Sequence, residues 1–106
     1  MAKYLIEVSY TVEGLKGLLK DGGTGRKKAI EATLKSVGGK LEALYFAFGK
    51  SDVFLLIDMP DNVSTAAVGL TVAASGSVRS RTVVLLTPAE IDQAVKKAVS
   101  YRPPGK

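Results

Sequence analysis

Residues 40–59 read KLEALYFAFGKSDVFLLIDM, two apolar stretches separated by a short polar segment. Both stretches place apolar side chains on the two sides of an alternating pattern, which indicates strands with two apolar faces. Residues 49–52 have the composition of a turn. Because so few residues connect the two strands, they should pair as an antiparallel hairpin.

The segment before this hairpin predicts one strand and two helices. Residues 3–10 alternate apolar and polar side chains, which is typical of a strand. A short helix follows over residues 11–20, with a threonine as its cap, and the glycines at 22–23 end it. A second helix begins near Thr24 and ends at the glycines of residues 38–39.

The segment after the hairpin predicts a helix, a strand and a last helix. Asp61 caps a helix over residues 63–74, which consists mainly of small apolar side chains, and residues 78–86 form the fourth strand. The sequence Thr87–Glu90 is a capping box with proline at the first helical position. The last helix should bury an apolar stripe made by Ile91, Ala94, Val95 and Ala98.

This order of elements is that of an α+β, ferredoxin-like βαββαβ fold with an extra short helix after the first strand and a C-terminal helix. The first and third strands should lie in the centre of a four-stranded antiparallel sheet. Two helices cover only one face of such a sheet, and an uncovered apolar face usually marks an interface. We therefore expect a homodimer or higher homo-oligomer formed sheet to sheet. The side chains expected on the uncovered face are Leu5, Leu44, Phe46, Phe54, Leu56, Val83 and Leu85.

Composition limits the chemistry available to the chain. The 106 residues carry a net charge of +5 and contain no Cys, no His and no Trp, which removes thiolate and imidazole chemistry and the commonest transition-metal ligands. No dense carboxylate cluster suggests a metal site, and no cofactor is expected. With 46% hydrophobic residues, we expect one domain over residues 1–100 and a flexible basic tail over 101–106. The first residues form neither a signal peptide nor a membrane span, so a cytoplasmic protein without a membrane partner is expected.

The sequence resembles the GYD-domain family, small bacterial proteins with a ferredoxin-like fold related to the dimeric α/β-barrel proteins. The resemblance covers Tyr4 to about Ala94. It rests on short motifs spread along the chain, among them Ser9-Tyr10-Thr11, Gly22-Gly23 with Arg26, Gly38-Gly39, Tyr45 to Gly49, Pro60-Asp61-Asn62, and Gly76 with Arg79. Around the hairpin turn Gly49 and Asp52 match the residues that name the family, and Ser51 stands at the usual tyrosine. The resemblance implies a fold and an oligomer but no reaction.

The glycine-rich segment before the second helix is a candidate anion site. Gly23 and Thr24 would supply backbone N–H groups, and Arg26 and Lys28 would supply positive charge. The spacing is not that of a Walker motif. The alternative is a helix start with solvated basic side chains.

Strand residues provide a second candidate site. Glu7 and Arg81 should share the uncovered face, together with Asp58, and Tyr10 and Tyr45 could line a pocket for a planar ligand. The alternatives are ion pairs that fix how two subunits dock and aromatic side chains that fill the core.

We interpret the chain as a small homo-oligomeric protein that binds a small ligand, anionic or aromatic, at the sheet–helix or the subunit interface. The alternative is a cofactor-free enzyme resembling an isomerase or monooxygenase of the dimeric α/β-barrel type. The lack of a nucleophile beside a base favours binding over catalysis. Basic residues concentrate in residues 16–40, but the third strand lacks the aromatic pattern of RNA-recognition domains, which argues against nucleic acid as a partner.

Overall fold

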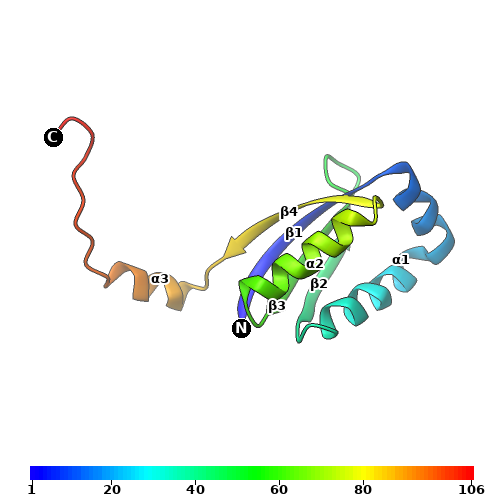
Figure 1. Cartoon of the computed structure of the whole chain (residues 1–106), viewed down its shortest axis with the longest axis horizontal. Coiled ribbons are helices and arrows are strands. Elements are labelled where there is room, and N and C mark those ends of the chain that lie inside the picture. The colour runs from blue at the N-terminus through cyan, green and yellow to red at the C-terminus, as the bar shows by residue number, and fades with distance from the viewer.

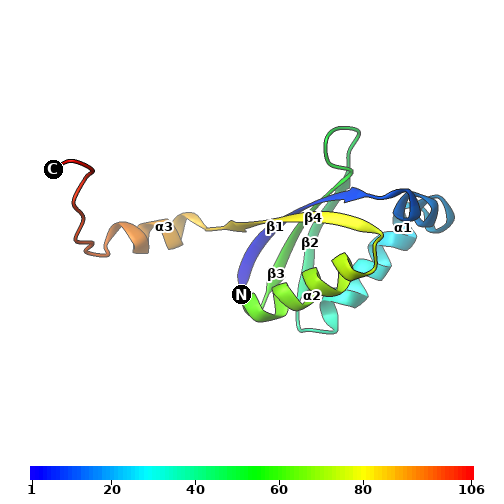
Figure 2. The same ribbon diagram turned by 45° about the horizontal axis from the view of Figure 1, so that its top comes forward.

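A computed structural model describes all 106 residues and confirms the α+β, ferredoxin-like order of elements. The strands form one antiparallel sheet in the order β2-β3-β1-β4, with β3 and β1 in the centre as predicted. Helices α1 and α2 lie on the same face of this sheet, and α3 extends away from it in line with β4 (Figures 1 and 2). The elements are β1 (Ala2–Tyr10), α1 (Val12–Lys35), β2 (Lys40–Phe46), β3 (Val53–Met59), α2 (Asn62–Ala74), β4 (Val78–Leu85) and α3 (Pro88–Val95).

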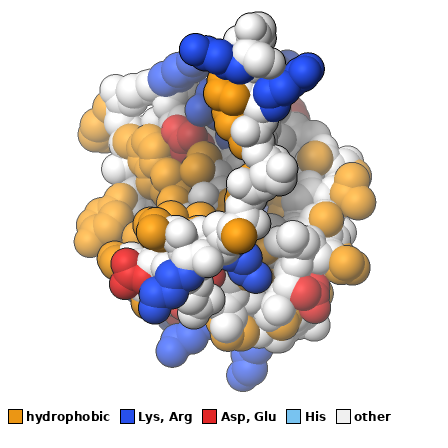
Figure 3. All heavy atoms as spheres, turned by 90° about the vertical axis from the view of Figure 1, so that its left-hand side faces the viewer, with side chains coloured by type: hydrophobic (Ala, Val, Ile, Leu, Met, Phe, Trp, Pro, Cys, Tyr) orange, Lys and Arg blue, Asp and Glu red, His pale blue; other side chains and the backbone are white.

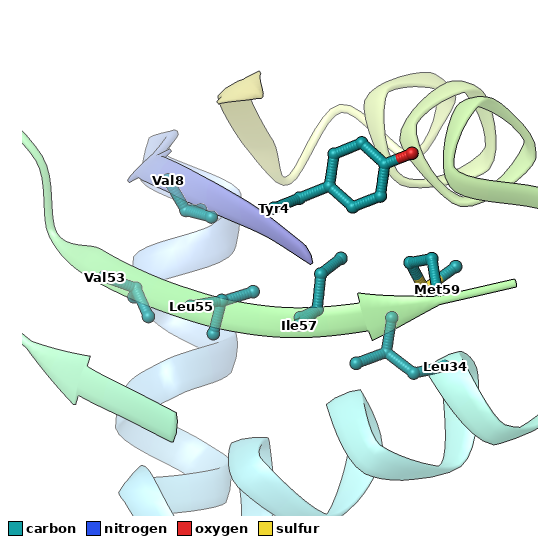
Figure 4. Close-up of a cluster of buried hydrophobic side chains, with 7 residues drawn as sticks. All are labelled: Tyr4, Val8, Leu34, Val53, Leu55, Ile57 and Met59. Atoms are coloured by element: carbon teal, nitrogen blue, oxygen red, sulfur yellow. The ribbon is translucent and has the colours of Figure 1, made fainter. Parts of the chain in front are cut away.

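The hydrophobic core lies between the two central strands and the helices (Figure 4). Alternate side chains of β1 and β3 point toward the helices, and Leu34 of α1 packs against them. This alternation follows directly from the pleat of the strands, since every second residue faces the same side. The buried set is Tyr4, Val8, Leu34, Val53, Leu55, Ile57 and Met59.

Side-chain caps set the helix starts where the sequence predicts them. The Thr11 hydroxyl accepts a hydrogen bond from the Gly14 N–H (3.3 Å), and the Asp61 carboxylate accepts one from the Ser64 N–H (2.7 Å). This hydrogen bond from Ser64 holds the pKa of Asp61 below its usual value. The predicted break between the first two helices is confirmed as a kink within α1, because Gly22 has φ 72° and leaves the helical conformation.

A β-bulge changes the predicted faces of β2. Leu41 lies opposite Ile57, but Ala43 lies opposite Leu56, so one extra residue, Glu42, enters the strand. Every side chain after the bulge therefore points to the face opposite to the one predicted. Leu44 and Phe46, expected on the uncovered face, lie opposite Leu55 and Val53 on the helix side, and Tyr45 replaces them on the uncovered face.

The last helix also differs from the prediction. Its stripe of Ile91, Ala94, Val95 and Ala98 was expected to be buried, but all four residues are exposed. After β4 the chain continues outward into α3 instead of turning back over the sheet (Figures 1 and 2). The capping box itself is present, with both the Thr87 and the Glu90 hydrogen bonds. The sequence thus predicts the start of the helix correctly, whereas the helix ends at Val95, before Ala98, and its stripe is not buried.

Candidate functional site

A pocket opens between α1, α2 and the inner face of the sheet. It has a volume of about 120 Å³ and is lined by 17 residues, of which 11 are hydrophobic. An apolar cavity of about 150 Å³ is large enough to bind benzene. The pocket, called here the helix-side pocket, therefore has room for a small ring or a short aliphatic chain.

Polar side chains of β4 face this pocket. Ser80 and Thr82 lie opposite Val8 and Ile6 of β1 and line the pocket, at positions where a sheet packed under helices normally carries apolar residues. On the other side of the pocket, Gly69 of α2 contributes no side chain to the lining. A Cβ atom at Gly69 would have no other heavy atom within 4 Å, so no close packing requires a glycine there. The missing side chain leaves the pocket open.

Arg26 is the charged residue of the pocket. Its side chain is 33% exposed and lines the pocket together with apolar residues of the sheet and of α2. The nearest carboxylate, Asp21, lies 3.7 Å away across the Gly22 kink, which is longer than a hydrogen bond. The guanidinium group is therefore only loosely paired, and its hydrogen-bond donors remain available.

The four predicted anion-site residues do not form one site in this structure. Arg26 lines the pocket, whereas Lys28 is exposed and does not. Gly23 and Thr24 are also exposed, and Gly23 lies close to the ring of Phe46, because a Cβ there would be 3.3 Å from it.

The predicted ligand-binding residues are divided between the two faces of the sheet. Tyr10 lines the helix-side pocket. Glu7, Asp58, Arg81 and Tyr45 lie on the opposite, uncovered face, as the register of the strands shows. The set therefore does not converge on a single pocket.

The uncovered face carries an apolar band between ion pairs. Ala43, Leu56, Leu5 and Val83 lie opposite one another across the four strands. On one side of this band Lys3 pairs with Asp58 (2.9 Å) and Glu42 (3.0 Å), and on the other Arg81 donates to Glu7 (3.2 Å). The two carboxylates raise the pKa of Lys3 above its usual value.

The hairpin residues that match the family motif lie between β2 and β3 and form hydrogen bonds with the end of β1. The Asp52 carboxylate accepts a hydrogen bond from the Tyr10 N–H (2.8 Å). The Ser9 hydroxyl donates to the Lys50 carbonyl in the same connection (3.2 Å). Gly49 has open space where a Cβ would be, and Ser51 is half-buried. The contacts of Asp52 indicate a structural role.

Sequence reasoning missed the polar residues of β4 and the glycine of α2 as pocket residues. The signal was present, because the inward positions 78, 80, 82 and 84 read Val, Ser, Thr, Val in a strand that should be apolar on that side. Such a break in the hydrophobic pattern is typical of a functional site.

Comparison with known proteins identifies the family. The GYD domain model matches residues 4–95. A curated relative, the medium-chain-fatty-acid–[acyl-carrier-protein] ligase JamA of Moorena producens (strain JHB), is 35% identical over 82 residues. The alignment covers 74% of this chain but only 14% of the length of that ligase. None of the helices is both long and apolar enough to cross a membrane. Since the family match covers most of the chain, the protein belongs to the GYD domain family.

Proposed function

We propose that this GYD domain binds a small carboxylic acid with an apolar body in the helix-side pocket. The observation that carries the proposal is a loosely paired arginine at a mainly apolar pocket: Arg26 is the one charged side chain among the 17 lining residues. Ligand sites typically combine an apolar lining with a few polar groups that fix orientation.

The chemistry of the lining favours a carboxylate. A guanidinium group binds a carboxylate through two parallel hydrogen bonds, which is stronger than a contact to Asp21 at 3.7 Å. The apolar part of the ligand would lie against residues such as Val68 and Val72 of α2. The hydroxyls of Ser80 and Thr82 could then accept or donate a hydrogen bond to a hydroxyl or carbonyl substituent on the ligand.

The named relative agrees with this class of ligand. That protein is named as a ligase of medium-chain fatty acids, which are carboxylic acids with apolar bodies. The matched segment is too small a part of it to locate the ligase reaction, so the likeness supports the ligand class and not the reaction. With a volume of about 120 Å³, the pocket favours a short chain over a long one.

Binding accounts for the pocket better than the alternative of a cofactor-free isomerase or monooxygenase. Such an enzyme needs an acid or base beside the ligand. Of the candidate acid–base residues, Tyr10 lines the pocket, while Glu7 and Asp58 engage in ion pairs on the other face of the sheet.

The test is a titration of the full chain with sodium butyrate, hexanoate and octanoate, followed by NMR shifts of backbone amides. We expect saturable shifts at residues lining the pocket, and at least tenfold weaker binding of the best acid by Arg26→Gln. Lys28→Gln removes a nearby charge that does not line the pocket and should bind as the unmodified protein does. Equal binding of hexanoate and hexylamine would contradict the proposal.

We also propose that the uncovered face of the sheet joins two copies of the chain. Its apolar band lies across all four strands, and its central residues are not covered within the chain. The flanking ion pairs of Lys3 and of Glu7 would fix the register of the two sheets. This assembly is independent of ligand binding, because the pocket lies on the other side of the sheet.

A further inference from the structure

We propose that the C-terminal arm, residues 86–106, docks the apolar side of α3 on the outer face of α2 in a second copy of this chain. The arm leaves the body of the protein at the end of β4 and does not pack on the sheet or on the other helices (Figures 1 and 2). This contact is distinct from the uncovered face of the sheet and does not depend on the ligand pocket.

The arm contains a helix that needs a partner. Helix α3 has eight residues, and isolated helices of fewer than about 12 residues are marginal in water. Its apolar side is unprotected, since Ile91 is 45% and Val95 78% exposed. Its capping box stabilises the start of the helix but covers none of this side. Hydrophobic side chains also gather at the end of the molecule from which the arm extends (Figure 3).

The outer face of α2 supplies a matching surface. The helix contains no charged residue, and Val63 (79% exposed) and Leu70 (73% exposed) lie on its outer side with Ala66 and Ala67 between them. These positions have the spacing i, i+3, i+4 and i+7, and the first three recur in α3 as Ile91, Ala94 and Val95, the residue at which that helix ends. Alanines in the centre let a second helix approach closely.

Charge favours an antiparallel arrangement of the two helices. In that orientation Lys96 and Lys97, just after α3, would lie near Asp61 at the start of α2. Asp61 is exposed, and the Ser64 N–H that donates to its carboxylate favours the charged form. Opposite charges and antiparallel helix dipoles would then both stabilise the contact.

The position of the arm favours a second copy over its own α2. Helix α3 continues outward from β4, away from the body of its own chain (Figures 1 and 2). A single eight-residue helix buries less than the roughly 800 Å² per partner of a standard interface. A reciprocal exchange, in which each of two chains binds the arm of the other, doubles the contact.

Because the chain contains no cysteine, single-cysteine variants report the contact directly. Under mild oxidation a mixture of Ala67→Cys and Val95→Cys chains should form a disulfide-linked pair of different chains. A mixture of Val95→Cys and Ser51→Cys chains is the control, because residue 51 lies in the hairpin connection and not on α2. This mixture should form at least tenfold less of the disulfide-linked pair of different chains. Equal yields from the two mixtures would overturn the proposal. A disulfide within one chain of the double variant Ala67→Cys/Val95→Cys, unchanged in yield on dilution, would also overturn it by showing that the arm covers its own α2.

A second measurement uses substitutions that leave the body of the protein intact. Ile91→Glu/Val95→Glu should halve the mass measured by light scattering, because each pair of chains joined by their arms would separate. The thermal unfolding midpoint of the body should stay unchanged. Gln93→Glu/Ser100→Glu adds the same charge away from the apolar stripe and should keep the original mass. An unchanged mass for the first variant would overturn the proposal.

Discussion

The Asp52 carboxylate accepts a hydrogen bond from the backbone N–H of Tyr10 at 2.8 Å, and the Asp52 N–H donates to the Val8 carbonyl at 2.7 Å. These two bonds attach the β2–β3 hairpin connection to the last residues of β1. They explain why an aspartate is useful at this point of the turn without assigning it any reaction. The connection is thereby fixed at the end of the sheet where α1 begins.

Replacing this carboxylate should destabilise the protein. Asp52→Ala leaves the Tyr10 N–H without its partner, and a hydrogen bond to a charged group contributes about 1.5–3 kcal/mol. We expect the free energy of unfolding in urea to fall by about that amount. Asp52→Asn keeps an acceptor oxygen and should lose less than half as much. Equal losses for the two variants would show that the charge, and not the hydrogen bond, matters.

A charge placed in the apolar band should dissociate the sheet-to-sheet assembly. Leu56 lies between Leu5 and Ala43 in the middle of that band. Leu56→Glu would bury an unpaired carboxylate in the interface, which is strongly unfavourable. We expect light scattering to give half the mass of the unmodified protein for Leu56→Glu. Circular dichroism should show nearly unchanged secondary structure.

The control for this variant is Ala29→Glu, which adds the same charge on the exposed side of α1. It should leave the mass unchanged. If Leu56→Glu also retains the original mass, the uncovered face is not the interface between subunits.

Local signals in the sequence predict the elements of this fold well but do not predict the faces of the edge strand β2 beyond its bulge. Thr11, Asp61 and Thr87 each mark a helix start, because capping is decided within a few residues. The bulge at Glu42 depends on pairing with β3, so alternation alone places Phe46 on the wrong face. Burial of α3 was wrongly expected for a related reason, since an apolar stripe indicates a partner but not whether it belongs to the same chain.

The candidate site was predictable only in part. The run of basic residues after a glycine turn predicts Arg26 as a binding residue. Lys28 in the same run is exposed and does not line the pocket. The rest of the pocket comes from the separation of α1 and α2 over the sheet, which brings Arg26 and Ser80 to one cavity across 54 positions of sequence. No local sequence pattern predicts how far apart α1 and α2 lie over the sheet.

The cap of α2 should make stability depend on pH in the acid range. The Ser64 N–H lowers the pKa of Asp61 below its ordinary value of 3.8, so the ionised carboxylate stabilises the folded state. This contribution is fully present above pH 3.8 and is lost as the pH falls through the lower, folded-state pKa. We expect the stability difference between the unmodified protein and Asp61→Asn to be constant near neutral pH and to shrink below pH 3.8. A difference independent of pH would show that the cap acts without its charge.

Substitutions at Gly69 of α2 should change the stability of the protein and its binding of carboxylates in different ways. At Gly69 no heavy atom lies within 4 Å of the position of a Cβ, so Gly69→Ala removes the helix penalty of glycine without a clash and should stabilise the protein by about 0.5–1 kcal/mol. The larger Gly69→Leu should fill much of the 120 Å³ cavity and weaken binding of the best carboxylate by at least tenfold while the fold is kept.

Gly17→Ala provides the matched control, because Gly17 is also helical with open space around it but does not line this pocket. It should raise the free energy of unfolding in urea by a similar amount and leave the titration unchanged. Undiminished binding by Gly69→Leu would place the carboxylate outside the helix-side pocket.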